Sequence, residues 1–295
     1  MQLALLQDTP VRPPGGTLPL GGRLNTHGKD VSYREIPCQQ VLGSSPAARR
    51  MGMPFSWTIN PYRGCEIGCG YCYARDTHSY LGQESVDFEH EIFVKLGAER
   101  SVVRAMRPGH FAGEAIAIGS ATDPYQPAER RYRVTRKVLE RLAAFSGLEL
   151  SITTKSPLIV DDADLLARIG KRSTLSVNIS LISLNGDLVR RFEPKGATPE
   201  KRLETISELA SRGIRVNLFI MPVMPDINDD PAELGRLERA ARAVGATSVV
   251  RGKFNLRAGA WPVFSAMLKE HYPHLLPDYR KKAQAAGLEA PTGPE

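Results

Sequence analysis

"GCEIGCGYCYAR", residues 64–75, places three cysteines within eight positions and surrounds them with glycines. Cys65, Cys69 and Cys72 follow the spacing C-x3-C-x2-C. Three thiolates in so short a loop can converge on one centre, because glycine lets the backbone take the turns that point side chains inward. Thiolates are the usual ligands of iron–sulfur clusters, in which a full set is four. The stretch therefore predicts a cluster with one iron left open to bind another group.

A structural zinc site is the alternative for these cysteines. Zinc prefers four closed ligands in paired spacings, and the fourth would have to be Cys38, His78 or His90. The cysteine spacing is unpaired and interrupted by glycines, which favours the cluster over zinc.

The composition is that of an ordinary globular protein, with 295 residues, 42% hydrophobic and 24% charged. No apolar stretch approaches the roughly 20 residues needed to cross a bilayer, and the N-terminus lacks the core of a signal peptide. We therefore expect a cytoplasmic protein with no membrane partner. The net charge of +7 favours a polyanionic partner such as a nucleic acid, although the same charge would also suit a solvated surface.

The chain divides into three predicted parts. Residues 1–52 are rich in Pro, Gly and Ser and predict an irregular N-terminal arm, residues 53–280 form the folded body, and residues 281–295 form a tail. Within the body, β-branched runs predict strands and apolar residues at helical spacing predict helices. The strands are expected near 56–60, 115–120, 148–154, 174–180, 214–221 and 247–254, with helices over 128–145, 198–212 and 231–244.

Repeated strand–helix units predict a parallel sheet, either open and doubly wound or closed into a whole or partial barrel. No Gly-x-Gly-x-x-Gly follows the first strand, which weakens a dinucleotide-binding fold. Polar segments instead follow several successive strands, as in the cysteine loop, "SATDPYQP" (120–127), "TKS" (154–156) and "MPDIND" (224–229). A site spread over many strand ends is typical of α/β barrels.

Tyr71, directly before the third cysteine, makes the loop resemble the signature C-x3-C-x-aromatic-C of the radical S-adenosylmethionine (SAM) enzymes. The resemblance implies an α/β fold, a partial (βα)6 barrel of the TIM type behind the irregular arm. It also implies a [4Fe-4S] cluster whose open iron is chelated by SAM. One-electron reduction then releases a 5′-deoxyadenosyl radical that abstracts hydrogen from a substrate. The electron would come from a carrier such as flavodoxin or ferredoxin.

A wider pattern resembles the spore photoproduct lyase-related, DNA-repair-photolyase-like group of these enzymes. The resemblance covers four segments, "NPYRGCEIGCGYCYAR" (60–75), "GSATDPYQPAERRYRVTRKVLE" (119–140), "ITTKSP" (152–157) and "MPVMPDIND" (221–229). It implies lyase chemistry on DNA as one model for the activity, with a nucleic acid as the possible substrate.

The resemblance also implies roles for individual residues. Tyr71 would pack on the adenine of SAM, and Tyr73 would line the path of the radical. Thr122 and Asp123 match the stretch that meets the methionine end of SAM, and Lys155 matches a lysine that pairs with the SAM carboxylate.

Further cofactor contacts are expected on the fourth strand and after the second. Ser176 and Asn178 would make polar contacts to the SAM ribose, and Ser120 opens the stretch at the methionine end. Ser120 also stands where the lyase carries its hydrogen-donating cysteine. A serine O–H bond is too strong to give its hydrogen atom readily to a carbon radical, so the resemblance implies different chemistry here. Cys38 is the one spare thiol and is expected to be incidental.

Other polar residues have both a functional and a structural interpretation. Arg251, Lys253 and Arg257 alternate on the last strand and are expected to face the barrel interior as part of the site or of an ion-pair cluster. Tyr125 and Gln126 would either contact a base or shape a turn. The basic segment 129–137 would either neutralise phosphates or form the solvated face of a helix.

The leading hypothesis is a radical SAM enzyme that acts on a larger substrate, with a nucleic acid as the candidate. One alternative is a radical SAM enzyme that modifies a protein or peptide. The other is a non-catalytic iron–sulfur or zinc protein that binds nucleic acid.

Overall fold

The computed structural model describes residues 24–26, 31–44, 53–106, 111 and 114–288. Its main sheet has seven strands in the order β11-β10-β9-β8-β7-β4-β3. All neighbouring pairs are parallel except β3 (Leu42–Ser44), which runs antiparallel to β4 at one edge. The six parallel strands are β4 (Trp57–Ile59), β7 (Ala115–Ile118), β8 (Glu149–Thr154), β9 (Thr174–Ser180), β10 (Arg215–Val223) and β11 (Ser248–Lys253).

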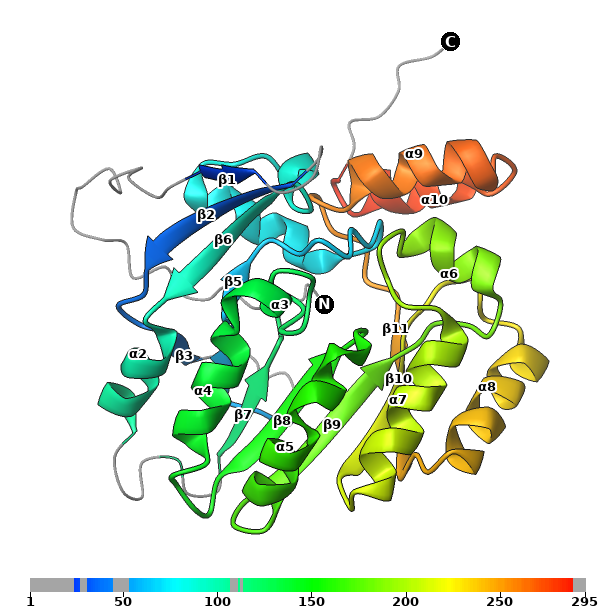
Figure 1. Ribbon diagram of the computed structural model, residues 1–295. Coiled ribbons are helices and arrows are strands. Elements are labelled where there is room, and N and C mark those ends of the chain that lie inside the picture. The colour runs from blue at the N-terminus through cyan, green and yellow to red at the C-terminus, as the bar shows by residue number, and fades with distance from the viewer. Residues whose placement is uncertain (1–23, 27–30, 45–52, 107–110, 112–113, 289–295) are drawn as a thin grey trace.

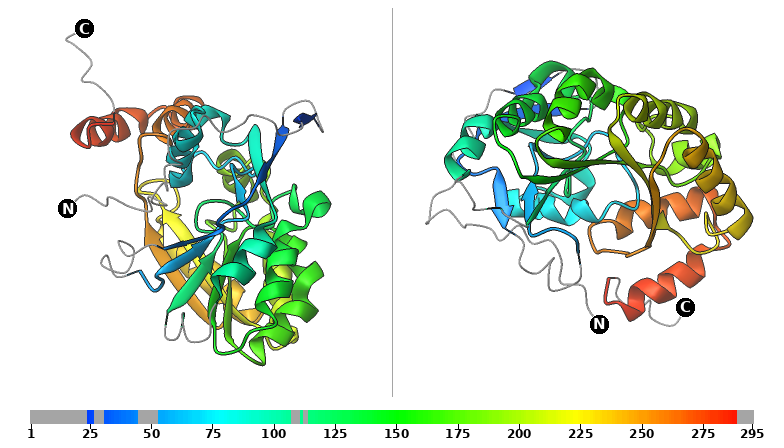
Figure 2. Two further views of the ribbon diagram at one scale, coloured as in Figure 1. Left: turned by 90° about the vertical axis from the view of Figure 1, so that its left-hand side faces the viewer. Right: turned by 90° about the horizontal axis from the view of Figure 1, so that it is seen from below.

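Helices cover the outer face of this sheet, and the sheet is curved, with its inner face turned away from these helices (Figures 1 and 2). The covering helices are α4 (Val134–Leu142), α5 (Ala163–Gly170), α7 (Pro199–Ser211) and α8 (Pro231–Ala243). Side chains on the helix side of β10, such as Val216, Leu218 and Ile220, are fully buried. The sheet stays open between its edge strands. The predicted α/β partial barrel of six βα units is confirmed.

The predicted helix over 128–145 is interrupted. A short helix, α3 (Glu129–Tyr132), ends at Arg133, whose φ of 51° lies in the left-handed region, and α4 then begins. The Glu129 carboxylate accepts hydrogen bonds from the backbone amides of Thr135 (3.0 Å) and Arg136 (2.9 Å). A carboxylate at this position satisfies amides that the first turn of α4 cannot pair. The break is therefore a capped restart of the helix.

A second sheet of four strands lies beside the barrel in the order β1-β2-β6-β5. Its strands are β1 (Leu24–Thr26), β2 (Ser32–Pro37), β6 (Glu91–Leu96) and β5 (Tyr62–Arg63). The described part of the N-terminal arm therefore contains β1, β2 and β3, and is more regular than predicted. These strands are short, and β2 depends on a distant partner, β6, which a local sequence pattern does not reveal.

The remaining elements lie in the connections between strands or at the C-terminal side. Residues 276–285 form α10, so a helix crosses the predicted start of the tail at residue 281. No helix in the described ranges is long and apolar enough to cross a membrane. The other elements are η1 (Tyr73–Leu81), η2 (Ser85–Asp87), α2 (Ala98–Ala105), η3 (Pro157–Asp162), α6 (Gly186–Phe192), α9 (Trp261–His271) and α10 (Leu276–Ala285).

Helix α9 lies directly against the cysteine loop. A Cβ added at Gly70 would collide with the Sδ atom of Met267, so a larger residue there would displace that side chain. The ring of Phe192 packs 6.0 Å from Phe264 of α9 and 5.8 Å from Tyr272, measured between ring centroids. The C-terminal helices therefore form one wall of the loop.

Candidate functional site

The cysteine loop follows β5 and is almost completely enclosed. Residues 64–71 are all buried, and Cys72 is partly buried. Gly64 has a φ of +81°, and a Cβ there would lie 2.5 Å from the carbonyl oxygen of Glu91, so the turn requires glycine. Burial raises the pKa of the Cys65 thiol well above its ordinary value, and the nearby Asp123, Cys69 and Cys72 raise it further. The three thiols therefore lie close enough to interact, and a bound cation would favour their thiolate forms.

Polar side chains from the segment after β7 hold the loop in place. The Thr122 hydroxyl donates to the Gly64 carbonyl (2.6 Å). The Gln126 amide also donates to that carbonyl (3.2 Å), and its oxygen accepts from the Glu66 backbone N–H (3.0 Å). Gln126 is fully buried, and Tyr125 is 1% exposed and donates its hydroxyl to Asp162. Tyr125 and Gln126 thus shape the turn, and neither is available for contact with a base.

The donor set of the loop consists of three cysteine sulfurs, the usual ligands of an iron–sulfur cluster. Among the described residues, no group of three His, Cys, Asp or Glu side chains is arranged around a site for a single metal ion. Two of the three candidates for a fourth zinc ligand, His78 and Cys38, have other neighbours. The His78 ring packs 5.4 Å from Phe88 and 5.8 Å from Phe93, and Cys38 lies beside Lys95 and Arg104.

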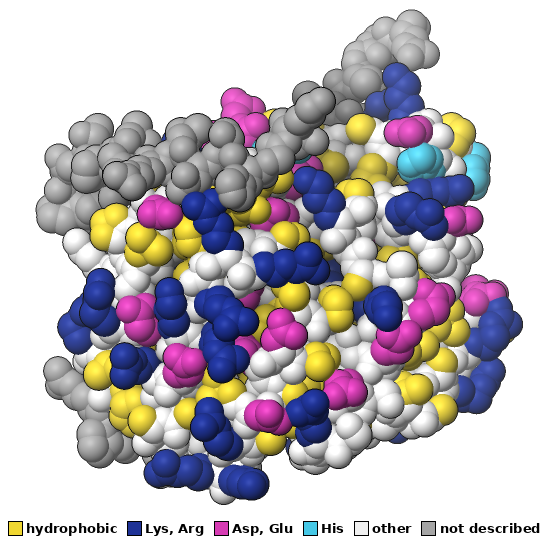
Figure 3. Space-filling model, viewed as in Figure 1, with side chains coloured by type: hydrophobic (Ala, Val, Ile, Leu, Met, Phe, Trp, Pro, Cys, Tyr) yellow, Lys and Arg dark blue, Asp and Glu magenta, His cyan; other side chains and the backbone are white. Residues whose placement is uncertain are grey.

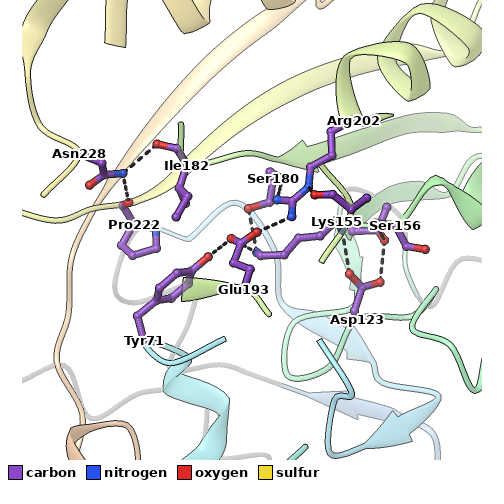
Figure 4. A network of polar contacts seen from close by, with 12 residues as sticks. Tyr71, Asp123, Lys155, Ser156, Ser180, Ile182, Glu193, Arg202, Pro222 and Asn228 are labelled. Carbon is purple, nitrogen blue, oxygen red and sulfur yellow. Dashed lines mark hydrogen bonds and ion pairs between the residues drawn. The ribbon is translucent and has the colours of Figure 1, made fainter. Parts of the chain in front are cut away.

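A buried network of charges lies next to the loop (Figure 4). Glu193, at the end of α6, accepts a hydrogen bond from the Tyr71 hydroxyl and forms an ion pair with Arg202 of α7. The ammonium of Lys155 lies 3.8 Å from the Glu193 carboxylate and donates to the Ser180 hydroxyl at 2.9 Å. It also lies 5.9 Å from the centroid of the Tyr71 ring. The end of β8, the end of β9, α6 and α7 therefore meet at the loop through these side chains.

The charges of this network determine its protonation. Burial opposes ionisation of Glu193, but the positive charges of Arg202 and Lys155 hold the pKa of its carboxyl below the ordinary value. Burial also acts against the charged form of Lys155, yet Glu193 and Cys69 keep its pKa above the ordinary value. Glu193 is thus an anion and Lys155 a cation inside the protein, where unpaired charges would be costly.

Asp123 braces the strand that carries Lys155. Its buried carboxylate accepts hydrogen bonds from the Thr154 hydroxyl (2.6 Å), the Lys155 backbone N–H (2.8 Å) and the Tyr125 backbone N–H (2.9 Å). The Lys155 backbone is therefore fixed relative to the loop through the segment after β7.

Tyr73 is the exposed tyrosine of the motif. Its side chain is 40% exposed, and its hydroxyl donates to the Ser120 carbonyl. The Ser120 hydroxyl accepts from the Asn60 side chain at 3.0 Å. The structure thus places Tyr73 and Ser120 together, with Tyr73 open to solvent.

Asn178 belongs to a polar ladder on the inner face of the sheet. Its amide donates to Ser151 (2.8 Å) and Thr153 (3.1 Å), and its oxygen accepts from Asn217 (2.9 Å). Asn217 in turn accepts from Ser248 at 2.7 Å. Ser176 shares a face with Asn178 on β9 and is partly exposed. The Asn178 side chain thus makes its hydrogen bonds within the barrel wall, whereas the Ser176 side chain is partly accessible.

The prediction that Arg251, Lys253 and Arg257 face the interior is wrong for Arg251. In register with the buried Ile220, Arg251 points to the helix side and pairs with Glu238 of α8 at 2.7 Å. Lys253 is exposed, and Arg257 lies 3.9 Å from Asp76 of η1. The inward position of β11 belongs to Val250, which pairs with Phe219.

Sequence reasoning missed the two central charges of the network. Glu193 and Arg202 sit in charged stretches, "RRFEPKG" (190–196) and "PEKRLE" (199–204), that look like solvent-facing segments. Both side chains are nevertheless fully buried. The buried helical spacing of Arg202, Ile206 and Leu209 on one face of α7 was the available signal.

Comparisons with known proteins agree with this geometry. The sequence model of the radical SAM superfamily matches residues 59–237. An uncharacterized protein of Mycobacterium tuberculosis is 34% identical over 252 residues, which cover 85% of this chain and 73% of the relative. An uncharacterized protein of Methanocaldococcus jannaschii is 31% identical over 177 residues, which cover 59% of this chain and 62% of the relative.

Among solved structures, spore photoproduct lyase complexed with dinucleoside spore photoproduct is similar in fold. The TM-score is 0.59 at 16% sequence identity, and the match covers 82% of this chain and 66% of that chain. Identity at this level shows the fold alone. The chain spans slightly less than two thirds of the length of that structure, so the activity of the lyase does not follow from the match.

Proposed function

Because the chain belongs to the radical SAM superfamily, we propose that Cys65, Cys69 and Cys72 hold a [4Fe-4S] cluster and that SAM binds at its open iron. The cluster and SAM together supply a 5′-deoxyadenosyl radical that abstracts hydrogen from a substrate. The observation that carries the proposal is the partly buried cation Lys155 beside the three-cysteine loop, paired with the buried Glu193 and facing the ring of Tyr71.

The residues of the network would bind and orient SAM. Lys155 would pair with the SAM carboxylate, because in the described ranges its ammonium forms an ion pair with one carboxylate, Glu193, which is already shared with Arg202. Tyr71 would pack on the adenine, and Ser176 would contact the ribose. Asn178 would act mainly by fixing the barrel wall beneath the ribose, since its own hydrogen bonds are made within the wall.

The segment after β7 would support the methionine end of SAM. Thr122 and Asp123 would contribute chiefly by fixing the loop and the Lys155 backbone, which their present hydrogen bonds already do. Ser120 would contact SAM through its hydroxyl. Tyr73, beside Ser120 and open to solvent, would line the path between SAM and the substrate.

A nucleic acid is the substrate class that the charge favours. The chain carries a net charge of +7, and two tyrosines of η1, Tyr73 and Tyr80, are each 40% exposed. Exposed aromatic rings can stack on bases, and cations neutralise phosphates. Ser120 cannot replace a hydrogen-donating cysteine, so the reaction would differ from lyase-type repair. We place the reaction in the cytoplasm, with flavodoxin or ferredoxin as the electron donor.

Anaerobic reconstitution with iron and sulfide tests the proposal. Electron paramagnetic resonance of the reduced protein, with and without SAM, is expected to show a cluster signal that SAM shifts, and the same sample should form 5′-deoxyadenosine. A colourless protein that retains zinc and leaves SAM intact would contradict the proposal and favour a non-catalytic nucleic-acid-binding protein.

A further inference from the structure

Four exposed cations surround the outer side of the cysteine loop. Arg130 and Arg131 lie on α3, Arg191 lies on α6, and Lys195 lies in the connection to α7. In Figure 1, α3 and α6 stand on either side of the loop. Hydrogen bonds join both of these segments to the loop. The Lys195 backbone N–H donates to the Ile67 carbonyl at 3.3 Å, and the Ala128 N–H at the start of α3 donates to Glu66 at 2.7 Å.

The acidic side chains around the loop are turned inward. Glu66 is buried and accepts from the hydroxyl of Tyr33, and Glu193 is buried with Arg202. Glu89 pairs with the buried Arg75 at 2.6 Å. The surface above the loop is therefore positive, because its negative charges are neutralised below it.

The four cations themselves are not neutralised. Within the described part of the chain, none of them forms an ion pair, in contrast to Arg190, which pairs with Asp187 at 3.1 Å. Arg131 lies over the ring of Tyr132 and Arg191 over the ring of Tyr272, contacts that leave the guanidinium charge in place. Figure 3 shows Lys and Arg side chains spread over this face of the molecule, with Asp and Glu side chains between them.

Next to Lys195, the loop lies under a thin cover. A Cβ added at Gly68 would touch Pro194 and Glu89, each at 3.5 Å, and Pro194 itself is exposed. A single layer of side chains thus separates solvent from the backbone between Cys65 and Cys69. A molecule bound over Pro194 would lie next to the loop without entering the barrel.

The surface suits an acidic protein better than a nucleic acid. Proteins that bind single strands combine cations with exposed aromatic rings. Of the two rings beside these cations, Tyr132 is only 8% exposed and Tyr272 is partly buried beneath Arg191. The exposed tyrosines Tyr73 and Tyr80 belong to η1, apart from these cations. Complementary charge chiefly accelerates association and orients a partner, which is what a transient exchange requires.

We propose that Arg130, Arg131, Arg191 and Lys195 form a docking surface for an acidic one-electron carrier protein. This inference rests on the proposed function, which requires one electron for each SAM cleaved. In the exchange the carrier loses one electron and the cluster gains it, changing from the 2+ to the 1+ state, and no atom is transferred. The docking surface and the route of the substrate would thus serve the cluster from different sides.

The test measures the rate at which the reconstituted protein is reduced. Stopped-flow absorbance of the cluster is followed with reduced flavodoxin and, separately, with photoreduced deazaflavin, a small neutral reductant. The double variant Arg131→Glu/Lys195→Glu should be reduced by flavodoxin at least about tenfold more slowly, with a weaker salt dependence. Its reduction by deazaflavin should match that of the wild type, which also shows that the cluster is intact.

The double variant Lys171→Glu/Arg172→Glu is the matched control. These exposed cations lie between α5 and β9, at the opposite end of the barrel, and their reversal changes the net charge equally. Its reduction by flavodoxin should remain close to that of the wild type. Equal slowing in both double variants, or slowing in neither, would overturn the inference.

Two further outcomes separate the hypotheses. If Arg131→Glu/Lys195→Glu loses binding to single-stranded DNA but keeps its flavodoxin rate, the surface is a nucleic-acid site and the docking inference is wrong. If the wild type is reduced by both reagents but forms no 5′-deoxyadenosine from SAM, the proposed function is wrong. The docking inference is then still decided by the flavodoxin reduction rates of the two double variants.

Discussion

The strand ends of β7, β8 and β9 are joined by buried charges, whereas β11 turns its charges away from the barrel. On the first side, Asp123 fixes the Lys155 backbone, and Glu193 links Lys155 to Arg202. On the second side, Arg251 pairs outward with Glu238, and the inward position is the apolar Val250, 39% exposed. The network of Asp123, Lys155, Glu193 and Arg202 thus lies in the half of the barrel beside the cysteine loop.

This difference separates two tasks within one sheet. Paired and hydrogen-bonded charges hold a fixed geometry, which suits a cofactor that must be oriented. The inner wall near β11 consists of neutral amides and hydroxyls, such as Asn217 and Ser248, and ends at the exposed apolar side chain of Val250, so it carries no fixed charge. The variants below test whether the two halves can be perturbed independently.

The largest effect is expected when a cysteine of the loop is replaced, and it concerns the content of iron and sulfide. Cys69→Ala removes one of three thiolates, so the reconstituted protein should retain almost no cluster. Cys38→Ala is the control, because that thiol lies at the end of β2 beside Lys95 and Arg104. Iron and sulfide analysis with the absorbance spectrum measures both. A full cluster in Cys69→Ala would remove that residue from the ligand set.

Breaking the buried network should cost more stability than breaking a surface pair. Glu193→Gln leaves Arg202 buried without its anion, and loss of one partner of a buried ion pair typically destabilises by about 3–5 kcal/mol. Asp187→Asn breaks the exposed pair with Arg190 and should cost about 0–1 kcal/mol. Urea denaturation of both variants gives the comparison. Similar small losses in the two would show that the network contributes little to the fold.

Lys155→Met should weaken SAM binding by about 10- to 100-fold, the usual effect of losing a hydrogen bond between charged groups. The cluster should remain, because the cysteine ligands are unchanged. Lys253→Met removes an exposed lysine from β11 and should leave the affinity as it is. Titration of the SAM-induced change in the cluster spectrum measures each affinity. An unchanged value in Lys155→Met would exclude Lys155 from the cofactor site.

The smallest predicted effect is a change in the pH dependence of stability, and it concerns His78, which lies behind the loop. Burial chiefly lowers its pKa to about 4 from an ordinary 6.5, in an environment of nearby charges, Arg63, Asp87, Glu89 and Arg75. Since the unfolded chain takes up the proton first, the fold loses stability as pH falls from 6.5 towards 4. The His78→Phe variant should lose less stability over that pH interval than the wild type. The His274→Gln variant, changed at an exposed site, should lose as much stability as the wild type. Urea midpoints at several pH values measure the slopes, and identical slopes would contradict the assignment.

The sequence predicted what depends on local pattern. All six parallel strands appear where β-branched runs predicted them, and the glycine-laced cysteines lie in one loop after the first of these strands. Local periodicity is strong in such segments because strands buried between helices must be apolar. The fold class followed from the order of these elements.

What the sequence did not predict depends on distant partners. Glu193 and Arg202 are buried because each neutralises the other, and neither neighbourhood reveals that pairing. The sequence pattern predicted Arg251 on the inner face of β11, whereas that face carries Val250, one residue earlier. Charged side chains can extend over either face of an edge strand, so their alternation does not reveal which face is the inner one. The break at Arg133 depends on Glu129 folding back to cap α4, which an uninterrupted helical pattern conceals.

The contact between Met267 and Gly70 has a consequence for biosynthesis. The loop is made early, whereas the helix that covers Gly70 comes near the end of the described chain. During synthesis, which proceeds from the N-terminus, the cysteines emerge from the ribosome long before their last wall exists. The nascent chain therefore exposes the thiols on this side before α9 has been made, and the loop is enclosed there only once α9 has folded against it.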